Sequence, residues 1–257
     1  MADEELPPSR LGTKDHWDSV YEREVRVYND VGDEGEVWFG ETSVTKMRKW
    51  AHKHIKPKAD GSAVRIMEAG SGNGTLLLSF LTSPAPLQDV DSARAGGQRP
   101  PKYHLTGIDY CESAAVLARS IEQSRRETLP SEIENPESDS DDDYDHDSDD
   151  EEQGCGKGLI MNDVECSWRT ADLLRSDLGG EKWDLVLDKG TYDALCLSDE
   201  GIEEEGGRLP SQVYPEKIAK LVEEAGFFLI TSCNFTEEEI KARYTKVGLG
   251  EYPLPRL

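Results

Sequence analysis

A glycine-rich segment headed by an acid is the part of this sequence best suited to hold a ligand. Residues Glu68–Gly74 read EAGSGNG and follow the apolar run Val64–Met67. Glycine allows the backbone to turn sharply and to approach a ligand without an intervening Cβ. A helix that begins directly after such a turn presents free N–H groups to a bound molecule. The segment indicates a nucleotide or nucleoside site, although a purely structural turn fits the same residues.

The spacing of the glycines distinguishes two cofactor classes. The dinucleotide fingerprint GxGxxG requires a glycine three positions beyond Gly72, and this sequence has Thr75 there. The GxGxG form headed by Glu68 instead favours S-adenosylmethionine over NAD, because the NAD pyrophosphate needs the other arrangement. We therefore expect the backbone of this segment to approach S-adenosylmethionine.

Acids also follow the second and third predicted strands. Asp109 ends the second strand, and its carboxylate can accept two hydrogen bonds from ribose hydroxyls. It lies further along the chain than the usual ~20 residues, because an insertion at 83–101 separates the two strands. After the third strand, Asp172 can accept from the exocyclic amine of adenine while the Leu173 N–H donates to a ring nitrogen. An aspartate here can equally cap a helix N-terminus, and the sequence leaves both interpretations open.

A further acid, Asp188, ends the fourth predicted strand and is followed by Lys-Gly-Thr-Tyr. It is a candidate both for holding the amino group of the cofactor and for orienting an incoming amine. Trp38, Phe39 and Tyr192 are candidates for an aromatic mouth that would favour a neutral amine by desolvation. Core packing would suit Trp38 and Phe39 equally well. The predicted catalytic residues are Asp188, Tyr192 and Trp38.

The elements that must position these residues alternate between helices and strands. The strands are short continuous apolar runs, which is typical of a parallel sheet covered on both faces. We predict an α/β fold with a doubly wound, mostly parallel sheet, in which the strand tips meet at one ligand. The predicted strands are 64–68, 103–108, 164–170, 183–187 and 227–230. The predicted helices are 13–29, 42–55, 75–81, 113–128, 212–225 and 237–244.

The chain is long enough for a single α/β domain, which we assign to residues 11–257. Residues 1–10 are predicted to be disordered, and 83–101 to form a flexible insertion. A second insertion, 131–157, contains the tract Glu134–Glu152, with twelve of the 53 acidic residues and no Lys or Arg. This tract repels itself and has few apolar groups, so we predict that it is disordered.

The net charge narrows the choice of partners. The formal charge is −24 at pH 7, and an acidic surface repels phosphate backbones. Nucleic acid is therefore a poor partner, whereas a basic protein or a small molecule is compatible. There is no secretory signal and no run of ~18–20 apolar residues, so we expect a cytoplasmic protein without a membrane span. We expect a monomer, and the cysteine spacing predicts no metal site.

Several strings in the sequence are more specific than the glycine segment. They are LGTK at 11–14 with Trp17, GDEGEVWFGE at 32–41, EAGSGNG at 68–74, LTGIDY at 105–110, VLDKGTYDA at 186–194 and LITSCNFT at 229–236. With these strings the sequence resembles the elongation-factor methyltransferase 4 family of protein-lysine methyltransferases. The resemblance covers most of the chain from residue 11 to about residue 244.

The resemblance implies a seven-strand, Rossmann-like class I methyltransferase that modifies a lysine ε-amine of translation elongation factor 1-alpha. It implies that Trp38 and the Asp188 loop lie beside the reactive end of the cofactor. The cofactor contacts that it implies are Glu68, Gly70, Gly72, Asp109, Asp172 and Leu173. Members of the family continue into two further strands, which we expect this chain to lack, so strand 227–230 would be a bare sheet edge.

Two other functions remain compatible with the sequence. The first is methylation of a small molecule or RNA by the same fold, against which the acidity and the absence of an NPPY-type string argue. The second is a C-terminally truncated, non-catalytic interaction protein. The intact glycine segment, Asp109 and Asp172 argue against such a loss of activity.

Overall fold

The computed structural model describes residues 6–84, 101–134 and 159–250. Most of each predicted insertion and the first five residues therefore lie outside the described residues. The main strands are β1 (Val64–Ala69), β3 (Lys102–Asp109), β5 (Asp163–Thr170), β6 (Trp183–Lys189) and β7 (Val222–Thr231). The helices are α1 (Lys14–Val31), α2 (Gly40–His54), α3 (Thr75–Leu78), α4 (Glu112–Glu134), α5 (Thr191–Leu195), α6 (Pro210–Leu221) and α7 (Glu237–Thr245). None of the described helices is long and apolar enough to span a membrane.

The five main strands form one parallel sheet in the order β5-β3-β1-β6-β7. From β1 the chain builds outward through β3 to β5, and it then returns to the other side of β1 to add β6 and β7. Ligands of such sheets bind where this reversal separates the strand tips, here between β1 and its neighbours. The arrangement confirms the predicted doubly wound, mostly parallel α/β fold. Within the described residues, β7 lies at the sheet edge.

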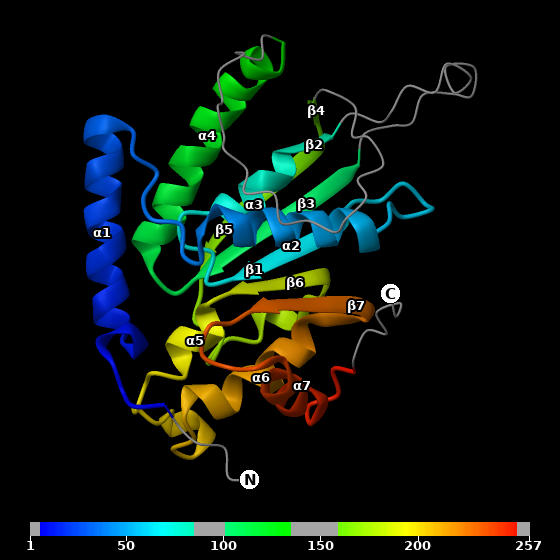
Figure 1. Ribbon diagram of the computed structural model, residues 1–257. Coiled ribbons are helices and arrows are strands. Elements are labelled where there is room, and N and C mark those ends of the chain that lie inside the picture. The colour runs from blue at the N-terminus through cyan, green and yellow to red at the C-terminus, as the bar shows by residue number, and fades with distance from the viewer. Residues whose placement is uncertain (1–5, 85–100, 135–158, 251–257) are drawn as a thin grey trace.

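Helices cover both faces of the sheet, as Figure 1 shows. Successive side chains of a strand point to opposite faces, and both faces of β1 are apolar. Ile66 packs in a cluster with Met47 of α2, whereas Met67 packs on the other face with Tyr214 of α6. Burial on both sides explains why the strands read as continuous apolar runs.

Helix α1 lies beside α4 and fixes the start of the domain over the carboxyl edge of the sheet (Figure 1). Trp17 packs against Cys111 and Ala114 at the start of α4, and its Nε1 donates to the Leu11 carbonyl at 2.8 Å. A short 3-10 turn, η1 (Arg10–Gly12), precedes the helix. This packing places the first turn of α1 next to the strand tips.

One predicted helix extends too far. Residues 222–225 were predicted to complete the helix 212–225, but α6 ends at Leu221 and these residues begin β7. Val222 pairs with Trp183, and the register then shifts before Phe227 pairs with Leu185. Pairing with β6 therefore overrides the helical preference of the local sequence.

A small antiparallel pair was not predicted. It consists of β2 (Thr82–Pro84) and β4 (Leu159–Met161), and it joins the chain on either side of the inserted segments. The buried Asn162 side chain donates to the Phe80 carbonyl and to the Ser83 hydroxyl, both at 2.8 Å. β4 directly precedes β5, so the pair lies at the amino edge of the sheet. Where the two predicted insertions begin, residues 82–84 form a strand and residues 131–134 belong to α4.

Candidate active site

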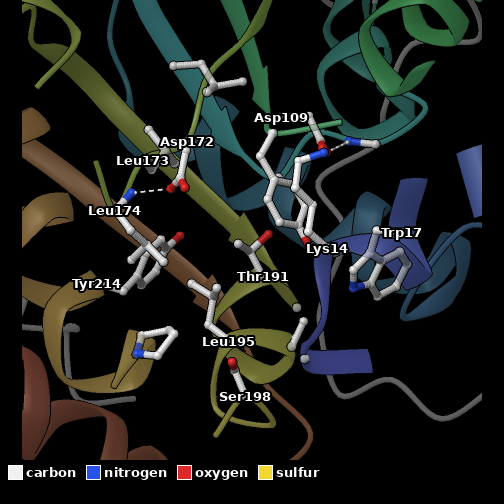
Figure 2. A pocket seen from close by; sticks show the side chains of 18 of the residues that line it. Lys14, Trp17, Asp109, Asp172, Leu173, Leu174, Thr191, Leu195, Ser198 and Tyr214 are labelled. Atoms are coloured by element: carbon white, nitrogen blue, oxygen red, sulfur yellow. Dashed lines mark hydrogen bonds between the residues drawn. The ribbon is translucent and has the colours of Figure 1, made fainter. Parts of the chain in front are cut away.

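A cavity of about 230 Å³ opens at the carboxyl edge of the sheet. Its wall comes from the glycine segment after β1, from the tips of β3, β5 and β6, and from α1 (Figure 2). In Figure 2, Asp109 and Trp17 lie on one side of the cavity, and Asp172, Leu173 and Tyr214 lie on the other. Segments far apart in sequence therefore meet where the fold predicts a ligand.

Two glycines of the segment are required by close packing. Gly70 and Gly72 have φ values of +62° and +51°, which side chains rarely adopt. A Cβ on Gly70 would lie 2.0 Å from Thr191 Oγ1, and one on Gly72 would lie 2.4 Å from the Tyr21 hydroxyl oxygen. Thr191 also donates to the Ala69 carbonyl at 2.7 Å. The turn is held between α5 and α1, and its backbone lines the cavity.

Asp109 lines the cavity as the side chain at the tip of β3. Its two oxygens accept the N–H groups of Gly72 at 3.0 Å and Cys111 at 2.9 Å. Burial raises the pKa of this carboxyl, and the two N–H donors oppose that rise. Each carboxylate oxygen can accept more than one hydrogen bond, so capacity for ligand hydroxyls remains.

Asp172 closes a turn after β5 and caps no helix, and its side chain also lines the cavity. One oxygen accepts the Leu174 N–H at 2.8 Å, which closes a turn, and the other pairs with Arg175 at 2.6 Å. The side chain also lines the cavity beside Leu173. The buried Leu173 adds an apolar wall next to this acceptor.

Two predicted site residues lie behind the wall of the cavity. Glu68 is 1% exposed, and its Oε2 has no hydrogen-bond partner among the described residues. Burial raises its pKa to about 8, opposed by the nearby Lys189. Asp188 is fully buried and accepts the Thr191 N–H and the Tyr214 hydroxyl, both at 2.8 Å. Burial raises the pKa of Asp188 to about 7, which these donors oppose.

The aromatic residues are distributed differently from the sequence prediction. Trp38 lines the cavity, but its partner there is Trp17, with ring centroids 4.7 Å apart. Tyr192 is fully buried on the other side of α5, where its ring stacks on Tyr214 at 5.9 Å. The Phe39 ring packs against Gly190, where a Cβ would lie 2.3 Å from the ring. Neither Tyr192 nor Phe39 belongs to the described lining of the cavity.

Sequence reasoning gave no role to several residues of the wall. Lys14 and Trp17 come from α1, Tyr110 follows Asp109, Lys189 follows Asp188, and Tyr214 comes from α6. The first four fall in or beside the strings that carry the family resemblance. Their place in these strings could therefore have identified them as candidate site residues. Tyr214 had no such signal, because only the packing of α6 against the sheet brings it to the cavity.

The residues present fit a nucleoside that carries a sulfonium group. Asp109 and Asp172 provide acceptors at separate strand tips for hydroxyls and an amine. Trp17 and Trp38 provide aromatic faces, which attract cations. The glycine turn provides backbone groups that no side chain shields. These donors and acceptors match the parts of S-adenosylmethionine.

The chain matches curated relatives along nearly its whole length. It is 34% identical to protein-lysine N-methyltransferase efm4 of Schizosaccharomyces pombe, over 95% of this chain and 84% of the relative. It is 31% identical to human EEF1A lysine methyltransferase 2, over 97% of this chain and 80% of the relative. For EFM4 of Saccharomyces cerevisiae the identity is 27%, over 92% and 81%.

Other comparisons are weaker. No family model matches the chain. A putative class I S-adenosylmethionine-dependent methyltransferase of Listeria monocytogenes is 12% identical, with a TM-score of 0.46 over 93% of this chain and 60% of that one. Magnesium protoporphyrin IX methyltransferase of Synechocystis is 17% identical, with a TM-score of 0.44 over 95% and 88%. The sequence relatives alone establish the family. The chain belongs to the protein-lysine N-methyltransferases that include efm4 and EEF1A lysine methyltransferase 2.

Proposed function

We propose that this protein transfers methyl groups from S-adenosylmethionine to a lysine of translation elongation factor 1-alpha. The observation that carries the proposal is the similarity to two relatives named for this activity, at 31% and 34% identity over 80% and 84% of their lengths. The cavity supports it, because acceptors, glycine turn and aromatic wall meet at one edge of the sheet. The family relationship also confirms the S-adenosylmethionine-dependent enzyme class predicted from the sequence.

Each part of the cavity has a proposed task. Asp109 accepts hydrogen bonds from the ribose, and Asp172 with Leu173 holds the adenine. The backbone of Gly70 and Gly72 receives the amino-acid end. When bound, S-adenosylmethionine supplies an electrophilic methyl group on a sulfonium. Glu68 and Asp188 act from behind the wall, where Asp188 fixes the first turn of α5 through Thr191.

The attacking lysine must lose a proton before it can react, because an ammonium has no lone pair. A lysine amine has an ordinary pKa of ~10.4. The paired rings of Trp17 and Trp38 give the cavity an apolar side, and desolvation there favours the neutral amine. The displacement at the methyl group is in line, so the remaining contribution of the chain is to hold the two reactants in position.

The proposal extends to the setting in which the protein works. We assign a cytoplasmic monomer, built as one methyltransferase domain, that acts on a basic protein and has no nucleic acid or membrane partner. The formal charge of −24 supports a basic protein as substrate and disfavours phosphate backbones.

Incubation with labelled S-adenosylmethionine and purified elongation factor 1-alpha tests the proposed function. We expect label in the elongation factor, located on one lysine by peptide mass spectrometry. Replacement of that lysine by arginine in the substrate should abolish labelling. Cofactor binding by calorimetry without any labelling of the elongation factor would show that the substrate assignment is wrong.

A further inference from the structure

One acid in the cavity wall has a free carboxylate close to the tryptophans. Asp109 and Asp172 accept hydrogen bonds from neighbouring backbone groups, as described above. Glu36 also lines the cavity, but its exposed carboxylate has no hydrogen bond or ion pair within the described part of the chain. Glu200, a second free acid of the wall, belongs to the segment that precedes α6. The Glu36 carboxylate is therefore an unpaired negative charge in the cavity wall, two residues from Trp38.

Glu36 belongs to the α1–α2 strap, residues 33–39, which joins α1 to α2. Figure 1 shows the chain turning at the end of α1 and running back toward the sheet before α2 begins. The Asn73 side chain donates to the Glu34 carbonyl at 3.0 Å, and the Glu34 carboxylate forms an ion pair with Arg125 of α4. The first half of the strap is thereby tied to the glycine segment.

The second half of the strap is held at the tip of β6. The Lys189 ammonium donates to the Trp38 carbonyl at 3.2 Å. The Glu36 N–H is bound by the carboxylate of Glu24 on α1, which faces the strap at Gly35 as well. The backbone of Glu36 is thus fixed on both sides, while its side chain stays free.

We propose that Glu36 binds the ε-ammonium of the substrate lysine as it enters the cavity, an inference that rests on the proposed function. A lysine ammonium has three donors and no acceptor, so a carboxylate without other partners is the complement that it needs. Trp38, two residues away, provides an apolar face for the methylene groups. Because Glu36 is exposed, the proton of the ammonium can leave to water before methyl transfer.

The position of Glu36 has a kinetic consequence that a structural role would not produce. A carboxylate stabilises a neighbouring ammonium and raises its pKa. Removal of the Glu36 charge should therefore lower the pKa of the bound lysine. The rising limb of kcat with pH should move to lower pH in the Glu36→Gln variant.

Steady-state kinetics with elongation factor 1-alpha tests this assignment. For Glu36→Gln we expect KM for the elongation factor to rise at least about tenfold, the usual loss for a hydrogen bond to a charged group. The affinity for S-adenosylmethionine by calorimetry should stay within about twofold. Glu36→Asp, which keeps the charge, should recover part of the loss. Glu41→Gln removes another exposed carboxylate just outside the strap and should behave like the wild type.

The outcomes separate the two proposals. An active wild type with an unchanged KM and pH profile in Glu36→Gln would overturn the role of Glu36 and leave the proposed function intact. A tenfold loss of S-adenosylmethionine affinity in this variant would assign Glu36 to the cofactor and overturn its role toward lysine. A wild type that binds the cofactor but never labels the elongation factor would overturn both.

Discussion

Four carboxylates lie at the strand tips, and they differ in whether they face the cavity and can contact a ligand. Asp109 and Asp172 face the cavity, whereas Glu68 and Asp188 are buried behind it. The difference follows from the position of each acid along its strand. Asp109 is the last residue of β3 and Asp172 follows the end of β5, whereas Glu68 and Asp188 each precede the last residue of their strand. The acids themselves could be predicted from the sequence. Whether each one reaches the cavity depends on the residue at which its strand ends, which the apolar pattern alone does not define.

Asp109 offers a direct test of the cofactor site. In Asp109→Asn one acceptor oxygen becomes a donor, so the variant should lose about tenfold or more in S-adenosylmethionine affinity by calorimetry. Asp163→Asn is a suitable control, because this exposed carboxylate lies at the opposite end of the sheet, at the start of β5. Equal affinities of the two variants would contradict a ribose contact at Asp109.

Glu68 predicts an unusual dependence of stability on pH. Its pKa in the folded protein is raised to about 8, so the folded state binds this proton more tightly than the unfolded state. The stabilisation is complete below the ordinary value of about 4.5 and is lost as pH rises through 8. Glu68→Gln mimics the protonated form, so its melting temperature should fall less than that of the wild type between pH 5 and about 8.5. Thermal unfolding at both pH values measures this, and an equal fall for the two proteins would contradict the raised pKa of the buried Glu68 carboxyl.

At the scale of elements, the position of α1 depends on one close contact made by the turn that precedes it. The η1 turn packs on the end of α5, where the Ser9 N–H donates to the Leu197 carbonyl at 3.0 Å. A Cβ on Gly12 would lie 2.3 Å from the Leu197 carbonyl carbon. The turn leads directly into Lys14 and Trp17, which line the cavity. Packing at Gly12 therefore sets the position of the first turn of α1, which forms part of the cavity wall.

Gly12→Ala should disturb both stability and binding. Overpacking of this kind typically costs about 1–3 kcal/mol, so the melting temperature should drop by several degrees. The affinity for S-adenosylmethionine should fall as well, because the first turn of α1 is displaced. Gly250→Ala is matched, since a Cβ there meets nothing within 4 Å. Indistinguishable behaviour of the two variants in thermal unfolding and calorimetry would rule out this packing role.

The elements differ in how well the sequence could predict them. All five main strands were predicted, and in β6 burial on both faces leaves the apolar run 185–187. The pair of β2 and β4 was missed, since three-residue strands carry little local signal and exist through long-range pairing. The same reason explains residues 222–225, where two glutamates and an alanine favour a helix but β6 supplies a partner.

At the scale of the whole molecule, charge should govern the encounter with substrate. The chain has a formal charge of −24, and attraction to a basic protein is screened by salt. KM for elongation factor 1-alpha should therefore rise between about 50 and 300 mM NaCl, where the Debye length shrinks from roughly 14 to 6 Å. The affinity for S-adenosylmethionine, measured by calorimetry across the same range, should change much less. A KM independent of salt would contradict electrostatic steering.

The small sheet of β2 and β4 also lies far from the cavity. It lies at the amino edge, whereas the cavity lies at the carboxyl edge, about 26 Å away along the eight residues of β3. Helix α4 likewise ends past the amino edge, since its Arg126 already contacts Val164 near the start of β5. The described residues next to both insertions therefore lie at the edge of the sheet opposite the cavity.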